Sequence, residues 1–187
     1  MVFDLGSLDV QEIREEAEYP GLRVRVKISI GTFSGKVVWD ISTGDPIVPI
    51  PKMVKVPRVL GADIEMLGYA PETVLAEKGV TILERGTTST RWRDYVDIVR
   101  LAEIHDVDDD LLLASAQAVA DYRGVDLKPI GSMLDGYGSI SQPEWAAWRR
   151  KEGFEDICDE SLDAQVAATA AVLNPVFARG RESLKPS

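Results

Sequence analysis

One lysine stands where the sequence otherwise places apolar residues. Pro71 and Gly86 suit the first position of a helix and the position just past its end, which predicts a helix over residues 71–85. On that helix Lys78 takes a place in the i, i+4, i+8 stripe whose other members are apolar. Burying an ammonium group beside a core costs free energy unless an anion pairs with it, so we expect a negatively charged partner or ligand.

An aspartate has a similar position on the next predicted helix, over residues 91–105. Asp94 shares a face with Ile98 and Leu101, at i, i+4 and i+7. If the two helices form an antiparallel hairpin, the axial offset between Lys78 and Asp94 is ~5 Å, within the reach of a lysine side chain. The spacing fits either a half-buried structural salt bridge or an open, solvated cleft in which the pair does chemistry. We expect the open cleft.

Asp97, one helical turn further on, has ordinary neighbours. Arg93 lies four residues before it and Arg100 three residues after it, which is the spacing of ion pairs on a helix surface. We therefore expect Asp97 to be an exposed partner of these arginines and no part of a pocket.

Two predicted strands upstream carry further charged residues. Over residues 22–30 apolar side chains alternate with polar ones, and Arg23, Arg25 and Lys27 share the polar face. These cations either keep a sheet surface soluble or bind phosphates or an RNA backbone. On the return strand, Asp40 is either a solvent-facing aspartate or a rigidly held carboxylate of the kind that binds a catalytic metal.

Four sequence blocks over residues 19–105 resemble the AbiEii/AbiGii-type nucleotidyltransferase toxins, among them mycobacterial toxins that modify tRNA. The blocks are YPGLRVRVKISIG, VVWDISTGDPIVP, YAPETVLAEK and TRWRDYVDI, in the order and spacing of the family. In such proteins the lysine of the third block and the aspartate of RWRD belong to the active site. The resemblance therefore implies Lys78 and Asp94 as catalytic residues, together with Asp40 from the second block.

The resemblance also implies a reaction. It is a Mg²⁺-dependent transfer of a nucleoside monophosphate from an NTP to an RNA hydroxyl, with the 3′ end of tRNA as the expected acceptor. Lys78 would bind the triphosphate, Asp40 would bind the metal, and Asp94 would support the metal and the geometry. The three cations of the basic strand would bind substrate. A cognate antitoxin is implied as a protein partner, in a type IV-like toxin–antitoxin system.

One family motif has no counterpart in the sequence. A Gly-Ser turn followed about ten residues later by Asp-x-Asp is expected before Pro20, and residues 1–19 contain no Asp-x-Asp. The string from Asp106 to Asp110 comes too late and is typical of an acidic helix start. The alternative hypothesis is an inactive, truncated relative that acts only as a protein-interaction module. A third is an ordinary domain whose charged pair is structural.

The composition excludes several classes of protein. A net charge of −10 opposes non-specific binding to nucleic acid or to anionic membranes, so an RNA contact requires a local basic patch. Cys158 and His105 are the single cysteine and the single histidine, which excludes an internal disulfide and a zinc-type cluster. No apolar run approaches the ~20 residues of a membrane span, so we expect a cytoplasmic chain.

We predict an α+β fold in two lobes. Residues 1–70 form a small antiparallel sheet of about four short strands, which resembles the later strands of a nucleotidyltransferase fold and is incomplete at its N-terminus. An acidic helix over about residues 9–18 precedes these strands. Residues 71–187 form a helical lobe against which the sheet packs.

Two signals concern the C-terminal helices. Pro175 predicts that the last helix, over about residues 161–173, ends before it. Trp145 and Trp148 lie at i and i+3 beside a basic run, where they are either core residues or a platform on which bases stack. The core is the simpler interpretation.

Overall fold

The computed structural model of the chain describes residues 1–13, 21–42 and 44–180. Small antiparallel sheets and α-helices make up the described residues, which confirms the predicted α+β class. The elements are β1 (Val2–Ile13), β2 (Gly21–Ile30), β3 (Phe33–Ser42), β4 (Lys52–Val56), β5 (Ile64–Gly68), α1 (Pro71–Arg85), η1 (Gly86–Thr88), α2 (Trp92–Ile104), α3 (Asp109–Arg123), η2 (Gly131–Met133), α4 (Tyr137–Glu152) and α5 (Leu162–Gly180).

The elements form two compact units, Met1–Asp45 and Pro46–Ser187. The first contains β1, β2 and β3, and the second contains the β4–β5 pair and all the described helices. The units divide the chain at a different point from the predicted lobes, 1–70 and 71–187, whose boundary stays a prediction.

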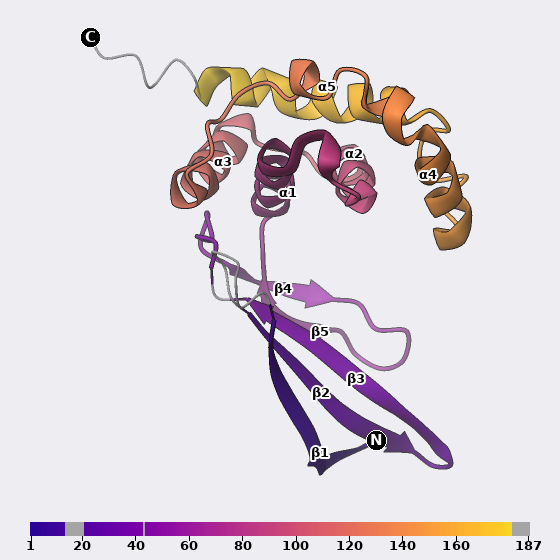
Figure 1. Cartoon of the computed structure of the whole chain (residues 1–187). Helices are drawn as coiled ribbons and strands as arrows, with labels where there is room; N and C mark the ends of the chain where they lie inside the picture. The colour runs from indigo at the N-terminus through magenta and orange to yellow at the C-terminus, as the bar shows by residue number, and fades with distance from the viewer. Residues whose placement is uncertain (14–20, 43, 181–187) are drawn as a thin grey trace. The chain divides into compact units, whose positions relative to one another are not determined.

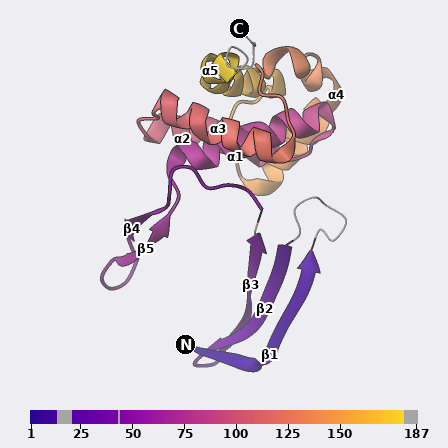
Figure 2. The ribbon, with the colours of Figure 1, turned by 90° about the vertical axis from the view of Figure 1, so that its left-hand side faces the viewer.

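The first unit is an antiparallel sheet in the order β1-β2-β3 (Figure 2). The alternation in β2 gives the sheet one apolar and one charged face, because neighbouring side chains of a strand point to opposite sides. On the apolar face Val26 lies opposite Val37, and the rings of Phe3 and Trp39 stack with centroids 6.4 Å apart. On the other face Arg23 lies opposite Asp40.

The predicted acidic helix over residues 9–18 is wrong where the structure describes it. Residues up to Ile13 belong to β1, which pairs with β2 from Val2 opposite Ser29 to Ile13 opposite Gly21. Pairing with the open edge of β2 satisfies backbone groups of this segment, and this tertiary contact overrides the local helical pattern. The rest of the predicted helix lies outside the described residues.

The predicted strands do not all join one sheet. Those near residues 54 and 64 form a separate antiparallel ribbon, β4 with β5, that directly precedes α1 (Figure 2). Between β3 and β4 the chain contains three prolines over residues 46–51. Because proline has no N–H to donate to a ladder, this stretch interrupts the sheet.

The proline-containing loop is fixed to two helices through one backbone oxygen. The carbonyl of Val48 accepts a hydrogen bond from Thr73 Oγ1 of α1, at 2.5 Å, and another from Ser115 Oγ of α3, at 2.6 Å. Both side chains are buried, so these contacts satisfy hydroxyls that water does not reach.

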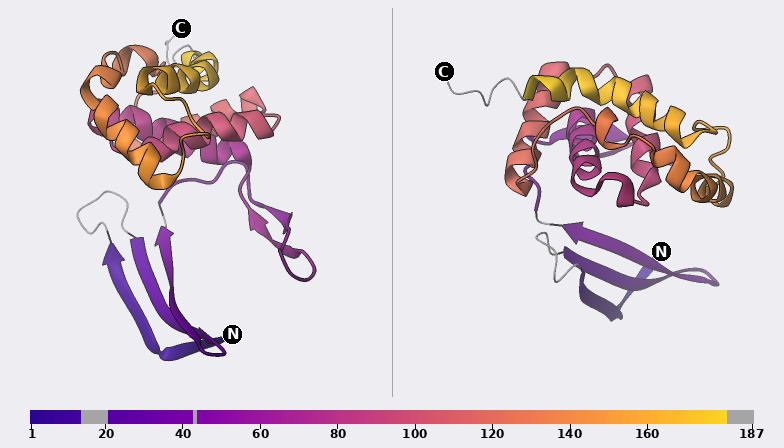
Figure 3. Two further views of the ribbon diagram at one scale, coloured as in Figure 1. Left: turned by 90° about the vertical axis from the view of Figure 1, so that its right-hand side faces the viewer. Right: turned by 45° about the horizontal axis from the view of Figure 1, so that its top comes forward.

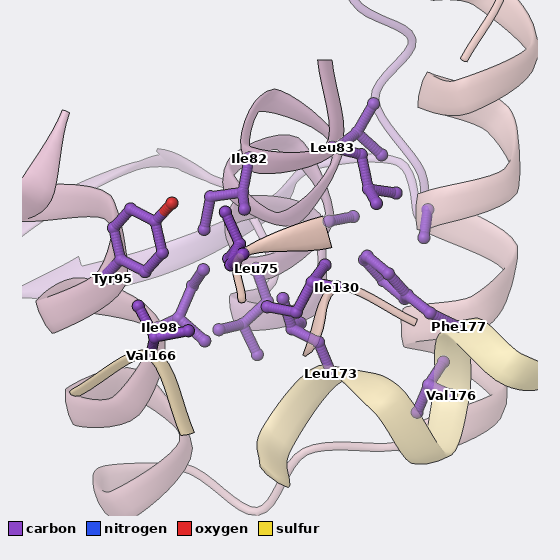
Figure 4. Close-up of a cluster of buried hydrophobic side chains, with 14 of the residues drawn as sticks. Leu75, Ile82, Leu83, Tyr95, Ile98, Ile130, Val166, Leu173, Val176 and Phe177 are labelled. Carbon is purple, nitrogen blue, oxygen red and sulfur yellow. The ribbon is translucent and has the colours of Figure 1, made fainter. Parts of the chain in front are cut away.

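The core of the second unit surrounds α1, with α2 and α3 on either side and α5 across them (Figure 1). Figure 4 shows the side chains that meet there, including Leu75 of α1, Ile98 of α2 and Leu173 of α5. Gly79 allows the close approach of α1 to α5, since a Cβ at this position would lie 2.6 Å from Cζ of Phe177. The helices that carry the candidate site are therefore held on a well-packed scaffold.

The last helix extends beyond its predicted end. α5 runs from Leu162 to Gly180 and contains Pro175 in its interior. A proline inside a helix loses one backbone hydrogen bond. Here the following residues Val176 and Phe177 are fully buried in the core, and their burial offsets that loss.

The helix α4 lies at one end of α5 (Figure 3). Trp145 is fully buried, and its Nε1 donates to the carbonyls of Asp159 and Glu160 at 3.2 and 3.1 Å. Its ring stacks on that of the half-buried Trp148, with centroids 5.2 Å apart. The core interpretation of Trp145 is confirmed.

Candidate functional site

The α1–α2 hairpin brings Lys78 and Asp94 into direct contact. Gly86, at a φ of +55°, ends α1, and the short η1 turn leads the chain back into α2. Lys78 Nζ then lies 2.6 Å from Asp94 Oδ1, which is salt-bridge distance. The predicted contact between the two side chains is therefore confirmed, and this pair is the centre of the candidate site.

The pair is more deeply buried than we expected. The side chain of Asp94 is only 4% exposed, and that of Lys78 is 20% exposed. The expectation of an open, solvated cleft is thus wrong for Asp94. Its second oxygen, Oδ2, accepts a hydrogen bond from Arg91 Nε at 2.7 Å, so two cations hold this carboxylate from both sides.

Asp97 also belongs to the cluster, which contradicts the sequence prediction. Its Oδ2 lies 2.8 Å from Lys78 Nζ. The two expected partners have more exposed side chains and reach other carboxylates: Arg93 pairs with Glu152 and Arg100 with Glu103. The signal that could have revealed this contact is the i, i+3 spacing between Asp94 and Asp97, which places both carboxylates on one face of α2.

The four charged groups of this cluster, Lys78, Arg91, Asp94 and Asp97, balance one another. Burial alone would raise the pKa of Asp94, but the hydrogen bonds from Arg91 and Lys78 outweigh it, and the pKa lies below its ordinary value. Burial would likewise lower the pKa of Lys78, but Asp94 and Asp97 raise it above its ordinary value. Lys78 is therefore a cation and Asp94 an anion at neutral pH.

Arg91 is the most accessible part of the cluster. Its side chain is 56% exposed, and Nε is the atom that binds Asp94. Within the described part of the chain, no hydrogen bond uses its two Nη groups. A guanidinium oriented by a carboxylate and open on its outer side suits the oxygens of a phosphate. Arg91 was not predicted as a site residue from the sequence, although RWRD places it three positions before Asp94.

Asp40 belongs to the first unit, whereas Lys78 and Asp94 belong to the second. Its Oδ1 and Oδ2 accept hydrogen bonds from Arg23 Nε and Nη2 across the β2–β3 pair, each at 2.7 Å. The role of Asp40 beside Lys78 and Asp94 stays a prediction.

Asp40, the Mg²⁺ ligand that the resemblance implies, is already bound by an arginine in this structure. Both oxygens of Asp40 are bound by Arg23, which competes with a cation for the same lone pairs. Within residues 1–13, 21–42 and 44–180, no group of three or more Asp, Glu, His or Cys side chains is placed to hold a metal. A Mg²⁺ site usually needs one or two carboxylates with the substrate phosphates. Mg²⁺ dependence is therefore still an expectation.

The basic strand is largely neutralised by its neighbours. Besides the Arg23–Asp40 pair, Arg25 Nη1 donates to Asp9 Oδ2 and to Gln11 Oε1, both at 3.0 Å. Lys27 is exposed. These cross-strand contacts favour the interpretation that the cations keep a sheet face soluble, and the assignment of these three residues as substrate-binding stays a prediction.

With this geometry in place, the comparison with protein families identifies the class of the molecule. The chain matches the family model AbiEii, described as nucleotidyl transferase AbiEii toxin of a type IV toxin–antitoxin system, over residues 2–168. The class is thus the nucleotidyltransferase toxins. Because the match covers most of the chain, the protein belongs to the AbiEii family, which confirms the family indicated by the four sequence blocks.

Two further comparisons, with curated proteins and with solved structures, gave no match. None of the helices in the described part of the chain is long and apolar enough to cross a membrane.

Proposed function

We propose that the chain transfers a nucleoside monophosphate from an NTP to an RNA hydroxyl, with the 3′ end of tRNA as the acceptor. Lys78 supports this proposal, since its ammonium is held beside the core by two carboxylates, Asp94 at 2.6 Å and Asp97 at 2.8 Å. A lysine held in this way keeps its positive charge at a defined position, where it can attract a triphosphate. The membership in the AbiEii family supports the class of reaction.

In the proposed reaction the RNA hydroxyl attacks the α-phosphorus of the NTP, and the bond to the β-phosphate oxygen breaks. The proton of the hydroxyl passes to solvent water, and pyrophosphate leaves with the electron pair of the broken bond and the additional negative charge. Lys78 and the outer nitrogens of Arg91 would stabilise that charge, which is larger in the transition state than in the bound NTP. The transfer requires little covalent chemistry from the protein, so position and charge account for most of the catalysis.

Asp94 would orient these cations rather than accept the proton. Both of its oxygens already accept hydrogen bonds, from Lys78 and Arg91. Its pKa lies below the ordinary value because those contacts outweigh its burial, which makes the carboxylate a weak base. Asp40 stays the proposed metal ligand, and Mg²⁺ would supply charge neutralisation at the phosphates when bound.

The family also implies a protein partner, the antitoxin of the toxin–antitoxin pair. We propose that this antitoxin is encoded with the chain and that NTP and tRNA are the small-molecule and RNA partners. The proposed site of action is the cytoplasm, where these substrates are found.

The proposal is tested by incubating the purified chain with each α-labelled NTP and total tRNA, with Mg²⁺ or with EDTA. We expect labelled tRNA only with Mg²⁺ and a loss of labelling of ~100-fold or more in Lys78→Met, which removes the charge and keeps most of the stem. Lys151→Met is the matched control, because the Lys151 side chain is 82% exposed and far less buried than Lys78. Equal labelling by Lys78→Met and the wild type would contradict the proposal.

The same assay separates the alternatives. Labelling that survives Asp40→Ala would remove Asp40 from the site. If no NTP labels tRNA while Lys78→Met lowers the melting temperature, the charged cluster is structural.

A further inference from the structure

The turn that leads into α2 is held by a buried tyrosine from a distant part of the chain. Tyr137, the first residue of α4, is fully buried. Trp92 Nε1 donates a hydrogen bond to Tyr137 Oη at 2.8 Å. The same hydroxyl donates to the carbonyl oxygen of Ser89. One hydroxyl group therefore connects two points of the turn.

These two points lie on either side of Arg91. Ser89 precedes it and Trp92 follows it, so the hydroxyl of Tyr137 binds the backbone carbonyl before the arginine and the indole side chain after it. Within the turn, the N–H of Arg91 donates to Ser89 Oγ at 3.2 Å. With its backbone held in this way, Arg91 reaches Asp94 at 2.7 Å. The residues on either side of Arg91 are thus held by contacts between buried groups.

The first turn of α2 is anchored again just beyond Asp94. The carbonyl oxygen of Tyr95 accepts hydrogen bonds from Gln165 Nε2 at 3.1 Å and from Thr169 Oγ1 at 3.2 Å. Both donors belong to α5 and are buried. Asp94 therefore lies between two anchored points, the Tyr137 bridge before it and the α5 contacts after it.

From these contacts we infer that Tyr137 is a positioning residue of the candidate site, which holds Arg91 in the orientation that binds Asp94 and faces an incoming phosphate. The inference rests on the proposed function for its effect on turnover, but the orientation of Arg91 is measurable without any substrate. Tyr137 touches neither Lys78 nor Asp94 in the contacts described above, so it acts through the turn.

The chain offers a matched control. Tyr95 is also fully buried, and its ring centroid lies 6.1 Å from that of Tyr137. Within the described residues its hydroxyl has no hydrogen-bond partner. Tyr95→Phe and Tyr137→Phe therefore remove the same atom from the same core, and only the second removes a bridge.

The first measurement follows the Nε–H proton of Arg91 by NMR, with Arg91→Lys to assign its signal. In the wild type this proton should exchange slowly with solvent, because it is bound to Asp94. In Tyr137→Phe its exchange should become about tenfold faster or more, at a temperature where both proteins are folded, while Tyr95→Phe leaves the rate unchanged. An unchanged rate in Tyr137→Phe would overturn the inference.

The second measurement is nucleotide transfer. We expect kcat/KM of Tyr137→Phe to fall by about 10- to 100-fold, since small displacements of a positioned group have effects of this size, whereas Tyr95→Phe should stay near the wild type. If the wild type transfers no nucleotide, the proposed function fails, and the exchange measurement still decides the role of Tyr137. If Tyr137→Phe does not fold, Trp92→Phe replaces it, because this variant removes the indole N–H that binds the same hydroxyl and keeps an aromatic ring. Exchange as slow as in the wild type would then contradict the inference.

Discussion

At the scale of single residues, the charged cluster combines a buried anion with progressively more exposed partners. The side chain of Asp94 is 4% exposed, that of Asp97 is 35% exposed, and Lys78 lies between the two carboxylates. Removing one partner from a buried ion pair leaves the other charge unpaired, whereas water replaces a partner at an exposed position. The three residues should therefore contribute unequally to stability.

Substitution of the buried carboxylate tests this order. We expect Asp94→Asn to lower the free energy of unfolding by ~3 kcal/mol, because Lys78 and Arg91 then face a neutral amide. Asp97→Asn, the control, should cost less than about 1 kcal/mol. Urea denaturation at pH 7 measures both. Equal and small losses would show that water reaches Asp94 freely.

The pH dependence of stability should have a defined sign. The pKa of Asp94 is lower in the folded chain than its ordinary value of 3.8, so its contribution is complete above that value and is lost as the pH falls through the folded pKa. The pKa of Lys78 is raised above 10.5, so its contribution is complete below that value and is lost at more alkaline pH. The stability difference between the wild type and Asp94→Asn should stay constant from about pH 5 to pH 9 and shrink below pH 4. A difference that grows in acid would contradict this assignment.

Part of the site could be predicted from sequence because helical geometry is local. The rise per residue is enough to place Lys78 opposite Asp94 once a hairpin is assumed. The burial of Asp94 and the contact of Lys78 with Asp97 could not be predicted, because both depend on neighbouring elements. Arg93 had an equally good partner within its own helix, and only the position of Glu152 on α4 shows why it binds elsewhere.

At the scale of elements, the connection between α4 and α5 depends on one buried arginine. Arg149 Nη2 donates to the carbonyls of Glu155, at 2.7 Å, and Cys158, at 3.1 Å. This loop has little regular structure, and Trp145 Nε1 binds two more of its carbonyls, those of Asp159 and Glu160. The guanidinium of Arg149 thus supplies hydrogen bonds that the backbone of a helix or sheet would otherwise supply.

Loss of this arginine should loosen the loop. We expect Arg149→Met to cost ~2 kcal/mol in unfolding free energy and to increase hydrogen exchange over residues 153–161, because hydrogen bonds to a charged donor are lost. Arg150→Met, which changes the exposed neighbour, should stay within ~0.5 kcal/mol. Exchange that rises equally in both variants would contradict the role of Arg149.

Elements were predictable where local chemistry defines their ends. Pro71 and Gly86 bound α1 at the expected positions, since each has a backbone preference that acts without neighbours. The strand β1 and the continuation of α5 through Pro175 depend on contacts made elsewhere, with the edge of β2 and with the core around Phe177. A local pattern contains no information about those partners.

At the scale of the whole molecule, the charge distribution limits how RNA can be bound. The net charge is −10, and Arg23 and Arg25 of the basic strand are already paired with Asp40 and Asp9. Few cations of this strand therefore remain to replace the counterions of an RNA backbone. Recognition of tRNA would depend on a small number of specific contacts rather than on a broad basic surface.

The salt dependence of binding measures how many RNA phosphates the protein neutralises. We expect the slope of log K for tRNA binding against log salt concentration to be no steeper than about −2, which corresponds to roughly three neutralised phosphates. Fluorescence anisotropy with labelled tRNA between 50 and 300 mM KCl gives the slope. A slope near −5 would show a basic surface that these ion pairs do not reveal.

The carbonyl of Val48, shared by Thr73 and Ser115, has a consequence for how sequences of this fold diverge. The acceptor is a backbone atom, which every residue type supplies. These two hydrogen bonds therefore place no constraint on the side chain at position 48 in evolution. The two donors are side chains, and replacing either by a residue without a hydroxyl removes one of the two hydrogen bonds. Relatives that keep these two hydrogen bonds should therefore vary at position 48 while they retain serine or threonine at positions 73 and 115.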